Sequence, residues 1–263
     1  MPPDERVLSC LRKMEARTIA SSADGRETRQ IGPFLAVTHP TNELIWLSYA
    51  LILPGAREED VTPATLAALR EHFRQRGRIL RFEILDPLRP WLGSRLEALG
   101  VQLQGRMPLM ICFPEQLQIA PCPDGFTLAW LHPDDPDELL AEYIRTGRIC
   151  FGGPGGDVAP REIAEQREHL AARRYRCMYA RGEGQVAGIG AMSCGNDELV
   201  GVGTLPTMRR RGIAAAISSR VVADHFERGA EAVWLSAGDE AAAALYAKIG
   251  FRRVGVQLNY ADP

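Results

Sequence analysis

The chain has 263 residues, of which 46% are hydrophobic and 24% are charged, and its formal net charge is −2. This balance is typical of a soluble globular protein with one large domain or two of ordinary size, and it gives no basic field for binding nucleic acid. The charged N-terminal stretch and the lack of an apolar run of about 18 residues predict neither a secretory signal nor a membrane span, so we expect a cytoplasmic protein with no membrane partner.

The cysteines and histidines predict no metal centre. The six cysteines are scattered and never spaced as CxxC. They are therefore expected to be small buried side chains in a reducing compartment. The five histidines show no metal-ligand spacing either.

In the first half, regular elements are predicted from Thr62 onward. Thr62 stands where a helix N-cap is expected and Pro63 occupies the first helical position, which predicts a helix through "ATLAALREHFRQRG". A strand "ILRFEIL", a helix "WLGSRLEALG" and a strand "MPLMICF" follow it. The segment "IAPCPDGF", residues 119–126, then breaks regular structure with two prolines and a glycine. We therefore expect two domains, at residues 1–118 and 124–263.

The second half alternates between strand and helix patterns. It begins with a strand "FTLAWL", a helix in "DDPDELLAEYIRTG", a glycine-rich loop "FGGPGG", a helix "PREIAEQREHLAARR" and three strands, "YRCMYAR", "QVAGIGAMS" and "ELVGVGTL". The apolar repeat of Ile213, Ile217 and Val221 predicts a helix that starts at about Arg210 or Arg211 and ends near Gly229. A buried strand "AVWLS", another helix and an alternating strand, "VGVQLNY", complete the chain. The fold class is α/β (α+β) with a mixed sheet.

The two halves resemble each other. The segment "HFRQRG" from residue 72 matches "HFERGA" from residue 225, and "LEALGVQLQG" from residue 96 matches "YAKIGFRRVG" from residue 246. The order of the elements around these segments also agrees. We interpret this as an internal duplication, with two similar domains in tandem, each a central mixed β-sheet flanked by helices.

Three consecutive arginines, Arg209, Arg210 and Arg211, stand where a strand gives way to a helix. Cations at this position oppose the helix dipole unless an anion is bound there. Gly212 has no Cβ and Ala214 is small, so a ligand can approach the backbone, and the first N–H groups of a helix have no partner within it. The segment therefore predicts a phosphate-binding helix start. A solvated basic surface is the alternative.

Two segments together resemble the GNAT superfamily of N-acetyltransferases. They are "VGTLPTMRRRGIAAAI" and "WLSAGDEAAAALYAKIGF", about 30 residues apart. The resemblance covers roughly residues 124–260. It implies an acyltransferase that uses acetyl-CoA as co-substrate and no metal, and that moves the acetyl group to a primary amine by direct attack of the amine. The first half would then be a degenerate GNAT-like copy.

The resemblance assigns roles to particular residues. The backbone of Val202, Gly203 and Thr204 would pair with the pantetheine arm as if it were another strand. Tyr246 would be the general acid that protonates the departing thiolate, although an aromatic side chain at the edge of the core is the alternative. The pyrophosphate would be bound by a loop and helix start made of Arg209, Arg210, Arg211, Gly212, Ile213, Ala214 and Ala215.

Glu198 is the candidate base for the amine proton. By the period of two, it is expected to lie on the same face as three later residues of its strand, Val200, Val202 and Thr204. An exposed glutamate at a strand start is an equally open interpretation. Asp239 stands where many relatives have an asparagine that contacts the cofactor arm, so that contact is in doubt and a helix cap is the alternative.

The first half lacks the same chemistry. In the alignment of the halves, Glu58, Glu59 and Asp60 fall opposite the start of the arginine-bearing helix, where they would repel a pyrophosphate. Leu96 falls opposite Tyr246. The first domain is therefore predicted to have no cofactor site.

Two other functions compete with acetyl transfer. One is a non-catalytic acyl-CoA-binding regulatory module. The other is a nucleic-acid binder that uses the arginines, against which the net charge argues. The acceptor is expected to be a small-molecule or peptide amine, and the sequence is compatible with a homo-oligomer.

Overall fold

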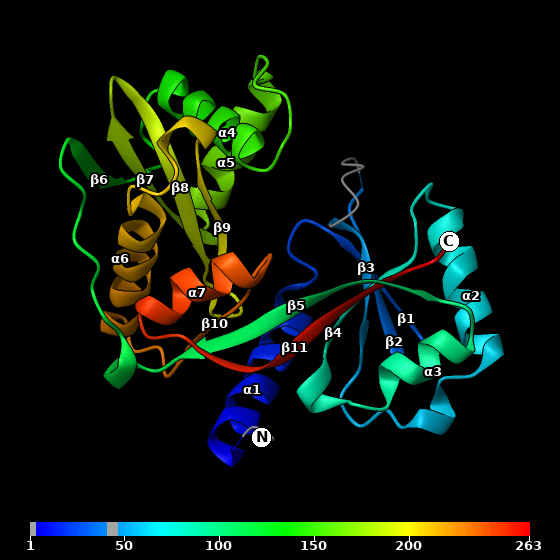
Figure 1. Ribbon diagram of the computed structural model, residues 1–263. Helices are drawn as coiled ribbons and strands as arrows, with labels where there is room; N and C mark the ends of the chain where they lie inside the picture. The colour runs from blue at the N-terminus through cyan, green and yellow to red at the C-terminus, as the bar shows by residue number, and fades with distance from the viewer. Residues whose placement is uncertain (1–3, 41–46) are drawn as a thin grey trace. The chain divides into compact units, whose positions relative to one another are not determined.

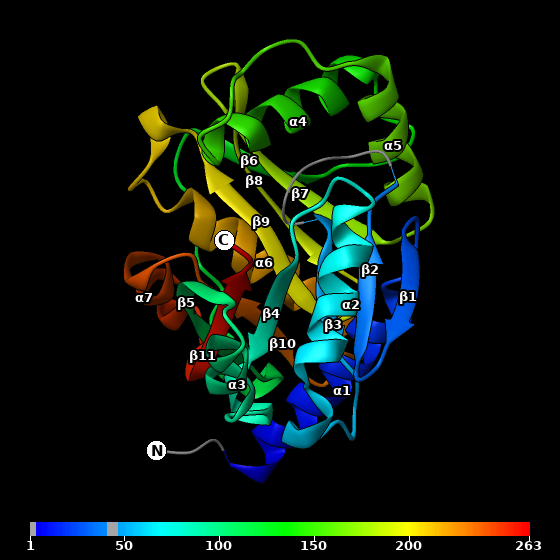
Figure 2. The same ribbon diagram turned by 90° about the vertical axis from the view of Figure 1, so that its right-hand side faces the viewer.

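The computed structural model describes residues 4–40 and 47–263 (Figures 1 and 2). The chain forms two compact units. Unit 1 combines residues 1–110, 236–240 and 253–263, and unit 2 combines residues 111–235 and 241–252. The units are therefore not two consecutive halves, because the chain returns to unit 1 for its last strand.

Unit 1 is a mixed β-sheet with helices packed on it. Its strands follow the order β1-β2-β3-β4-β11-β5. The pair β3–β4 is parallel, whereas β1–β2, β2–β3 and β4–β11 are antiparallel. The elements are α1 (Glu5–Ser21), β1 (Glu27–Ile31), β2 (Phe34–Thr38), β3 (Tyr49–Ile52), α2 (Pro63–Arg74), β4 (Arg81–Leu85), α3 (Leu92–Ala98), β5 (Gln102–Cys112) and β11 (Arg252–Ala261).

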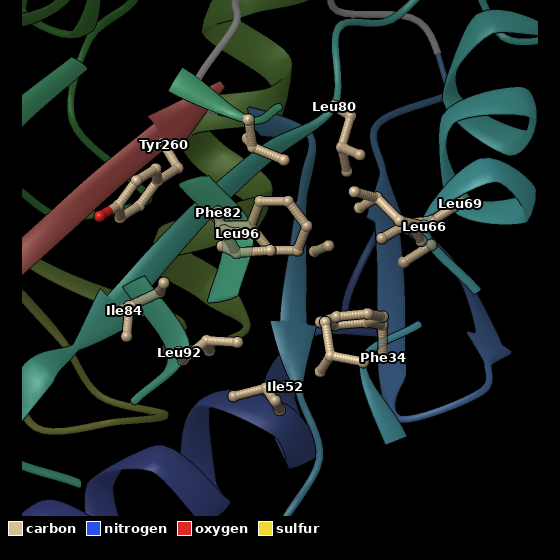
Figure 3. Packing of buried hydrophobic residues seen from close by; sticks show 14 of the residues in the cluster. Phe34, Ile52, Leu66, Leu69, Leu80, Phe82, Ile84, Leu92, Leu96 and Tyr260 are labelled. Carbon is tan, nitrogen blue, oxygen red and sulfur yellow. The ribbon is translucent and has the colours of Figure 1, made fainter. Parts of the chain in front are cut away.

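The last strand of the chain completes the core of unit 1. Leu258 and Tyr260, on one face of β11 as the alternation predicts, are 4% and 1% exposed and join the core cluster drawn in Figure 3. Burying side chains of this size contributes roughly 1.5–3 kcal/mol each. The Tyr260 hydroxyl also donates to Glu97 at 2.7 Å, and Arg70 binds both carboxylate oxygens of Asp262 at 2.9 Å. Packing and polar contacts together hold β11 in this sheet.

The start of α2 is closed by its own side chains, as predicted. The Thr62 hydroxyl accepts from the Thr65 backbone N–H at 3.1 Å, and Pro63 at the first helical position has no N–H to satisfy. The Thr65 hydroxyl accepts in return from the Thr62 backbone N–H at 2.9 Å. Two donors at this helix start are therefore satisfied within the chain.

Removing this cap should weaken unit 1. Thr62→Ala is expected to lower the free energy of unfolding by about 1 kcal/mol, because one backbone donor loses its acceptor. Thr62→Ser keeps the hydroxyl and is the control. Urea denaturation followed by circular dichroism measures both variants, and equal stability of the alanine and serine proteins would contradict the role given to the cap.

Unit 2 is built on the remaining five strands, with helices on both faces. Its strands follow the order β10-β9-β8-β7-β6, with β9–β10 parallel and the other pairs antiparallel. The elements are β6 (Phe126–Trp130), α4 (Asp137–Cys150), α5 (Pro160–Ala171), β7 (Tyr175–Gly182), β8 (Gln185–Ser193), β9 (Glu198–Thr204), α6 (Ile213–Glu227), β10 (Val233–Ser236) and α7 (Glu240–Lys248).

Strand β8 separates the two helical layers of unit 2 (Figure 1). Ile189 packs in a cluster with Leu140 and Tyr143 of α4. Gly190, the next residue, faces α6, where a Cβ would stand 2.7 Å from a methyl carbon of Ile217. Because neighbouring strand residues point to opposite faces, α4 and α6 cover opposite sides of this sheet.

The predicted fold class is confirmed, and the order helix–strand–helix–strand occurs twice along the chain, as α2-β4-α3-β5 and α6-β10-α7-β11. The start of α6, predicted at about Arg210 or Arg211, lies two to three residues later at Ile213, because Arg210 and Gly212 adopt positive φ angles of 66° and 88° that no α-helix contains. The sequence analysis missed α1 and β1–β3. Strand β1 is exposed along nearly its whole length, so it shows no alternation to read. No helix among residues 4–40 and 47–263 is long and apolar enough to cross a membrane.

Candidate functional site

Strand β9 has one edge that is largely open. It pairs with β8 along its length, but its register with β10 contains only Trp234 opposite Glu198. The Leu205 N–H, just past the strand, donates to the Ala187 oxygen of β8 at 2.9 Å. Because alternate residues direct their backbone groups to opposite edges, the groups of Thr204 face away from β8. This edge can accept an extended ligand as an additional strand.

A bulge changes which face the residues of β9 occupy. Gly201 has a φ of 60°, and the register with β8 shifts between Ile189 and Ala191. Before the bulge, Val200 packs with the cluster beneath α4. After it, Val202 lies beside Gly190 on the α6 face. The prediction that Glu198 shares a face with Val202 and Thr204 is therefore wrong, because the extra residue breaks the period of two.

Gly203 is needed for helix packing. A Cβ at this position would stand 2.5 Å from the Cβ and 3.0 Å from the sulfur of Cys150, the last residue of α4. Burial raises the pKa of the Cys150 thiol to about 11, so it is protonated and unreactive at neutral pH. The sequence analysis did not foresee this contact. The glycine within a strand pattern could have indicated this contact, because such a glycine often marks a close approach of another segment.

The three arginines have different environments. Arg209 donates to the backbone oxygens of Thr204 at 3.3 Å and Cys150 at 3.4 Å. Arg211 forms an ion pair with Glu183. Arg210 makes no hydrogen bond or ion pair with any of the residues that the structure describes. The Arg210 guanidinium is therefore available to a ligand.

The start of α6 is open. Its N-cap is Gly212, which provides no side chain, and the first bond of the helix runs from Ala216 N–H to the Gly212 oxygen. The N–H groups of Ile213, Ala214 and Ala215 therefore have no acceptor within the helix. The Thr204 hydroxyl oxygen is also buried without a hydrogen-bond partner among the described residues. These donors suit an anion such as a pyrophosphate.

The corresponding helix of unit 1 lacks these free donors. Helix α2, which aligns with α6, is capped by Thr62 and begins with a proline. The carboxylates at 58–60 form a short 3₁₀ turn before it, where Arg57 pairs with Glu59 at 2.9 Å. A phosphate would have to displace the cap and approach these carboxylates. Only α6 of the two helices offers an open start.

Tyr246 lies on α7 with its ring against Phe251, at 5.9 Å between centroids and in an edge-to-face arrangement. Burial raises the pKa of the Tyr246 phenol to about 12. In the described part of the chain, its hydroxyl has no hydrogen-bond partner. A phenol with this pKa remains protonated at neutral pH, so its proton is available for donation to a departing group.

Glu198 is positioned by the turn that precedes it. Its Oε2 accepts from the Asn196 side-chain amide at 3.1 Å. The Asn196 backbone oxygen accepts from the Trp234 indole at 2.8 Å, and Asp197 binds His225 at 2.9 Å. The turn is thus tied to β10 and α6. Asn196 was not predicted from the sequence, because the indole that fixes its backbone belongs to Trp234, a distant residue in the chain. No hydrogen bond between Glu198 and Tyr246 is present among the described residues.

In this mixed α/β domain, an open strand edge lies beside an uncapped helix start, an arrangement that can accept a phosphate-bearing ligand. A model of the acetyltransferase (GNAT) family matches residues 137–251. This segment contains α4 to α7 and with them all the predicted site residues. The chain therefore carries an acetyltransferase domain of the GNAT family.

Solved structures share the fold over nearly the whole chain. A GCN5-related N-acetyltransferase from Kribbella flavida is 23% identical, with 95% of each chain covered and a TM-score of 0.77. A tandem GNAT protein from the clavulanic acid biosynthesis pathway is 14% identical, with 95% of this chain and 86% of that one covered and a TM-score of 0.64. A GCN5-related N-acetyltransferase from Sphaerobacter thermophilus is 17% identical, with 99% and 91% covered and a TM-score of 0.66. No curated protein matches the sequence.

Proposed function

We propose that unit 2 transfers an acetyl group from acetyl-CoA to a primary amine. The observation that carries the proposal is the open start of α6 at Gly212, beside the open edge of β9, in a domain of an acetyltransferase family. The N–H groups of Ile213 to Ala215 and the Arg210 guanidinium would bind the pyrophosphate. The backbone of Val202, Gly203 and Thr204 would pair with the pantetheine arm.

The chemistry needs little from the protein beyond positioning and proton transfer. Acetyl-CoA supplies a thioester, which an amine attacks directly and from which a thiolate departs. Tyr246 would protonate this thiolate, and Glu198 would accept the amine proton, directly or through water. The open strand edge would polarise the thioester carbonyl by hydrogen bonding.

The acceptor and the cellular setting belong to the same proposal. We propose a small-molecule or peptide amine as acceptor, in the cytoplasm, with no nucleic acid, membrane or metal involved. Among the described residues, no group of three or more histidine, cysteine, aspartate or glutamate side chains could hold a metal ion.

The test is a screen of amines against the full chain with acetyl-CoA, following the release of free thiol. Stimulated release with at least one class of amine supports the proposal. Tight binding of acetyl-CoA without transfer to small amines or peptides would favour the non-catalytic acyl-CoA-binding module. Calorimetry should give one acetyl-CoA per chain, because α2 is capped, and two per chain would contradict the assignment of unit 1.

Glu198→Gln tests the base. The variant is expected to reduce kcat/KM by about tenfold near neutral pH, with acetyl-CoA affinity unchanged, because an amide cannot accept the amine proton. Asn196 can still donate to the glutamine oxygen, so the turn is expected to keep its structure. A steady-state assay with the best amine gives the result, and an unchanged kcat/KM would remove Glu198 from the reaction.

A further inference from the structure

Phe151 is an exposed aromatic residue beside the candidate site. Its relative exposure is 65%, compared with 55% for Ile79 and 44% for Ile119, the other large apolar side chains that are exposed among the described residues. Phe151 directly follows Cys150, the last residue of α4. Its ring Cε2 lies 3.8 Å from the point where a Cβ of Gly203 would stand. The ring therefore borders the end of β9 while most of its surface faces solvent.

The backbone that carries Phe151 is fixed to β9. The Cys150 oxygen accepts from Arg209, whose guanidinium also binds the Thr204 oxygen, and the Cys150 side chain packs against Gly203. The Phe151 N–H continues the helical pattern with a bond to the Gly147 oxygen at 3.2 Å. The position of the ring is thus set by the end of α4 and the end of β9 together.

The glycine-rich segment after Phe151 is attached to α4. The Gly153 N–H donates to the Arg148 oxygen at 2.8 Å, and the Arg148 guanidinium donates to the Asp157 oxygen at 3.0 Å. Arg145 also donates to the Gly156 oxygen at 3.4 Å. These contacts hold the loop against α4. The loop residues nevertheless leave most of the Phe151 ring exposed.

We infer that Phe151 packs against the pantetheine arm of the acyl donor and that Arg209 acts as a positioning residue for this contact. The inference rests on the proposed function. A chain paired with β9 lies about 4.8 Å from it, which is within reach of a ring that touches the Gly203 position. The methyl and methylene groups of the arm can cover a ring that water otherwise surrounds. Arg209 then supports ligand binding by donating to the Cys150 oxygen, which positions Phe151, rather than by contacting a phosphate.

The test compares two ligands that share a pyrophosphate but differ in the arm. Phe151→Ala is expected to weaken CoA binding by about five- to tenfold, the loss of a partly buried aromatic contact, and to leave ADP binding unchanged. Phe151→Leu should retain most of the affinity. Ile79→Ala removes a comparably exposed apolar side chain from unit 1 and is the matched control. Competition against a fluorescent CoA derivative measures the three variants and the wild-type chain.

Because most of the ring is exposed, Phe151→Ala should not change the melting temperature, which separates a binding effect from misfolding. Arg209→Ala should also weaken CoA more than ADP, and the double variant should lose less than the product of the two single losses. Unchanged CoA affinity in Phe151→Ala, or equal loss for CoA and ADP, would overturn the inference. A raised KM for the amine alone would do the same and assign the ring to the acceptor. Failure of the wild-type chain to bind CoA would instead contradict the proposed function.

Discussion

Tyr246→Phe is expected to lower kcat for acetyl transfer by about tenfold or more while acetyl-CoA affinity stays nearly unchanged, because general acid catalysis contributes at least that much. The substitution removes only the hydroxyl. The edge-to-face contact between residue 246 and Phe251 is retained, and the hydroxyl has no hydrogen-bond partner among the described residues, so stability should not change. The departing thiolate would then leave without its proton donor.

The pH dependence gives a second readout of the same residue. The pKa of Tyr246 is raised to about 12 by burial, so the proton-donating form is present below that pH and is lost only above it. Activity that depends on Tyr246 should therefore persist up to a pH of about 10. A fall in kcat that begins at a lower basic pH must come from the titration of another group. A pH series of kcat in the two proteins, with calorimetric binding of acetyl-CoA as control, measures both effects. Equal kcat in both proteins would exclude Tyr246 as the acid.

Gly250→Ala is expected to lower the free energy of unfolding by about 3 kcal/mol or more, because strain and overlap combine at this position. Gly250 follows α7 with a φ of 103°. A Cβ would stand 2.1 Å from the backbone oxygen of Gln116 and 2.7 Å from its carbonyl carbon. A backbone carbonyl cannot relieve the overlap by changing rotamer as a side chain can, so the end of α7 must shift. Tyr246 lies one turn earlier on the helix, so acetyl transfer should fall as well.

Gly229 provides the matched control for this substitution. Its φ is 92°, but nothing lies within 4 Å of the point where its Cβ would stand. Gly229→Ala should therefore show only the conformational cost, about 1 kcal/mol. Chemical denaturation of both variants separates the overlap from the strain. Equal losses at the two glycines would show that the contact with Gln116 yields easily and would contradict the prediction.

Much of unit 2 was predictable because its signals are local. Apolar periodicity predicted α6 from Ile213 onward, and the spacing of the arginine segment and the Tyr246 segment indicated the GNAT family. The cap at Thr62 needed only two neighbouring residues, and the structure has it. In each case, the residues that carry the signal lie close together in the sequence.

The site geometry was less accessible from the sequence. The bulge at Gly201 moves Val202 to the opposite face from Val200, and alternation alone cannot reveal an inserted residue. Arg209 and Arg211 looked equivalent to Arg210, yet they bind backbone oxygens and a carboxylate from other segments. Which arginine is available depends on partners as distant as Cys150 and Glu183.

The sequence by itself determined the family of the second half and the order of its elements, because motif spacing and periodicity are properties of contiguous chain. The tertiary structure alone decided where β11 pairs, why Gly203 must be a glycine and where Phe151 lies. The alternation of β11 predicts one buried face but not the sheet that covers it. Strand partners are selected by backbone hydrogen bonds and side-chain packing between segments far apart in the chain, and those contacts exist only after folding.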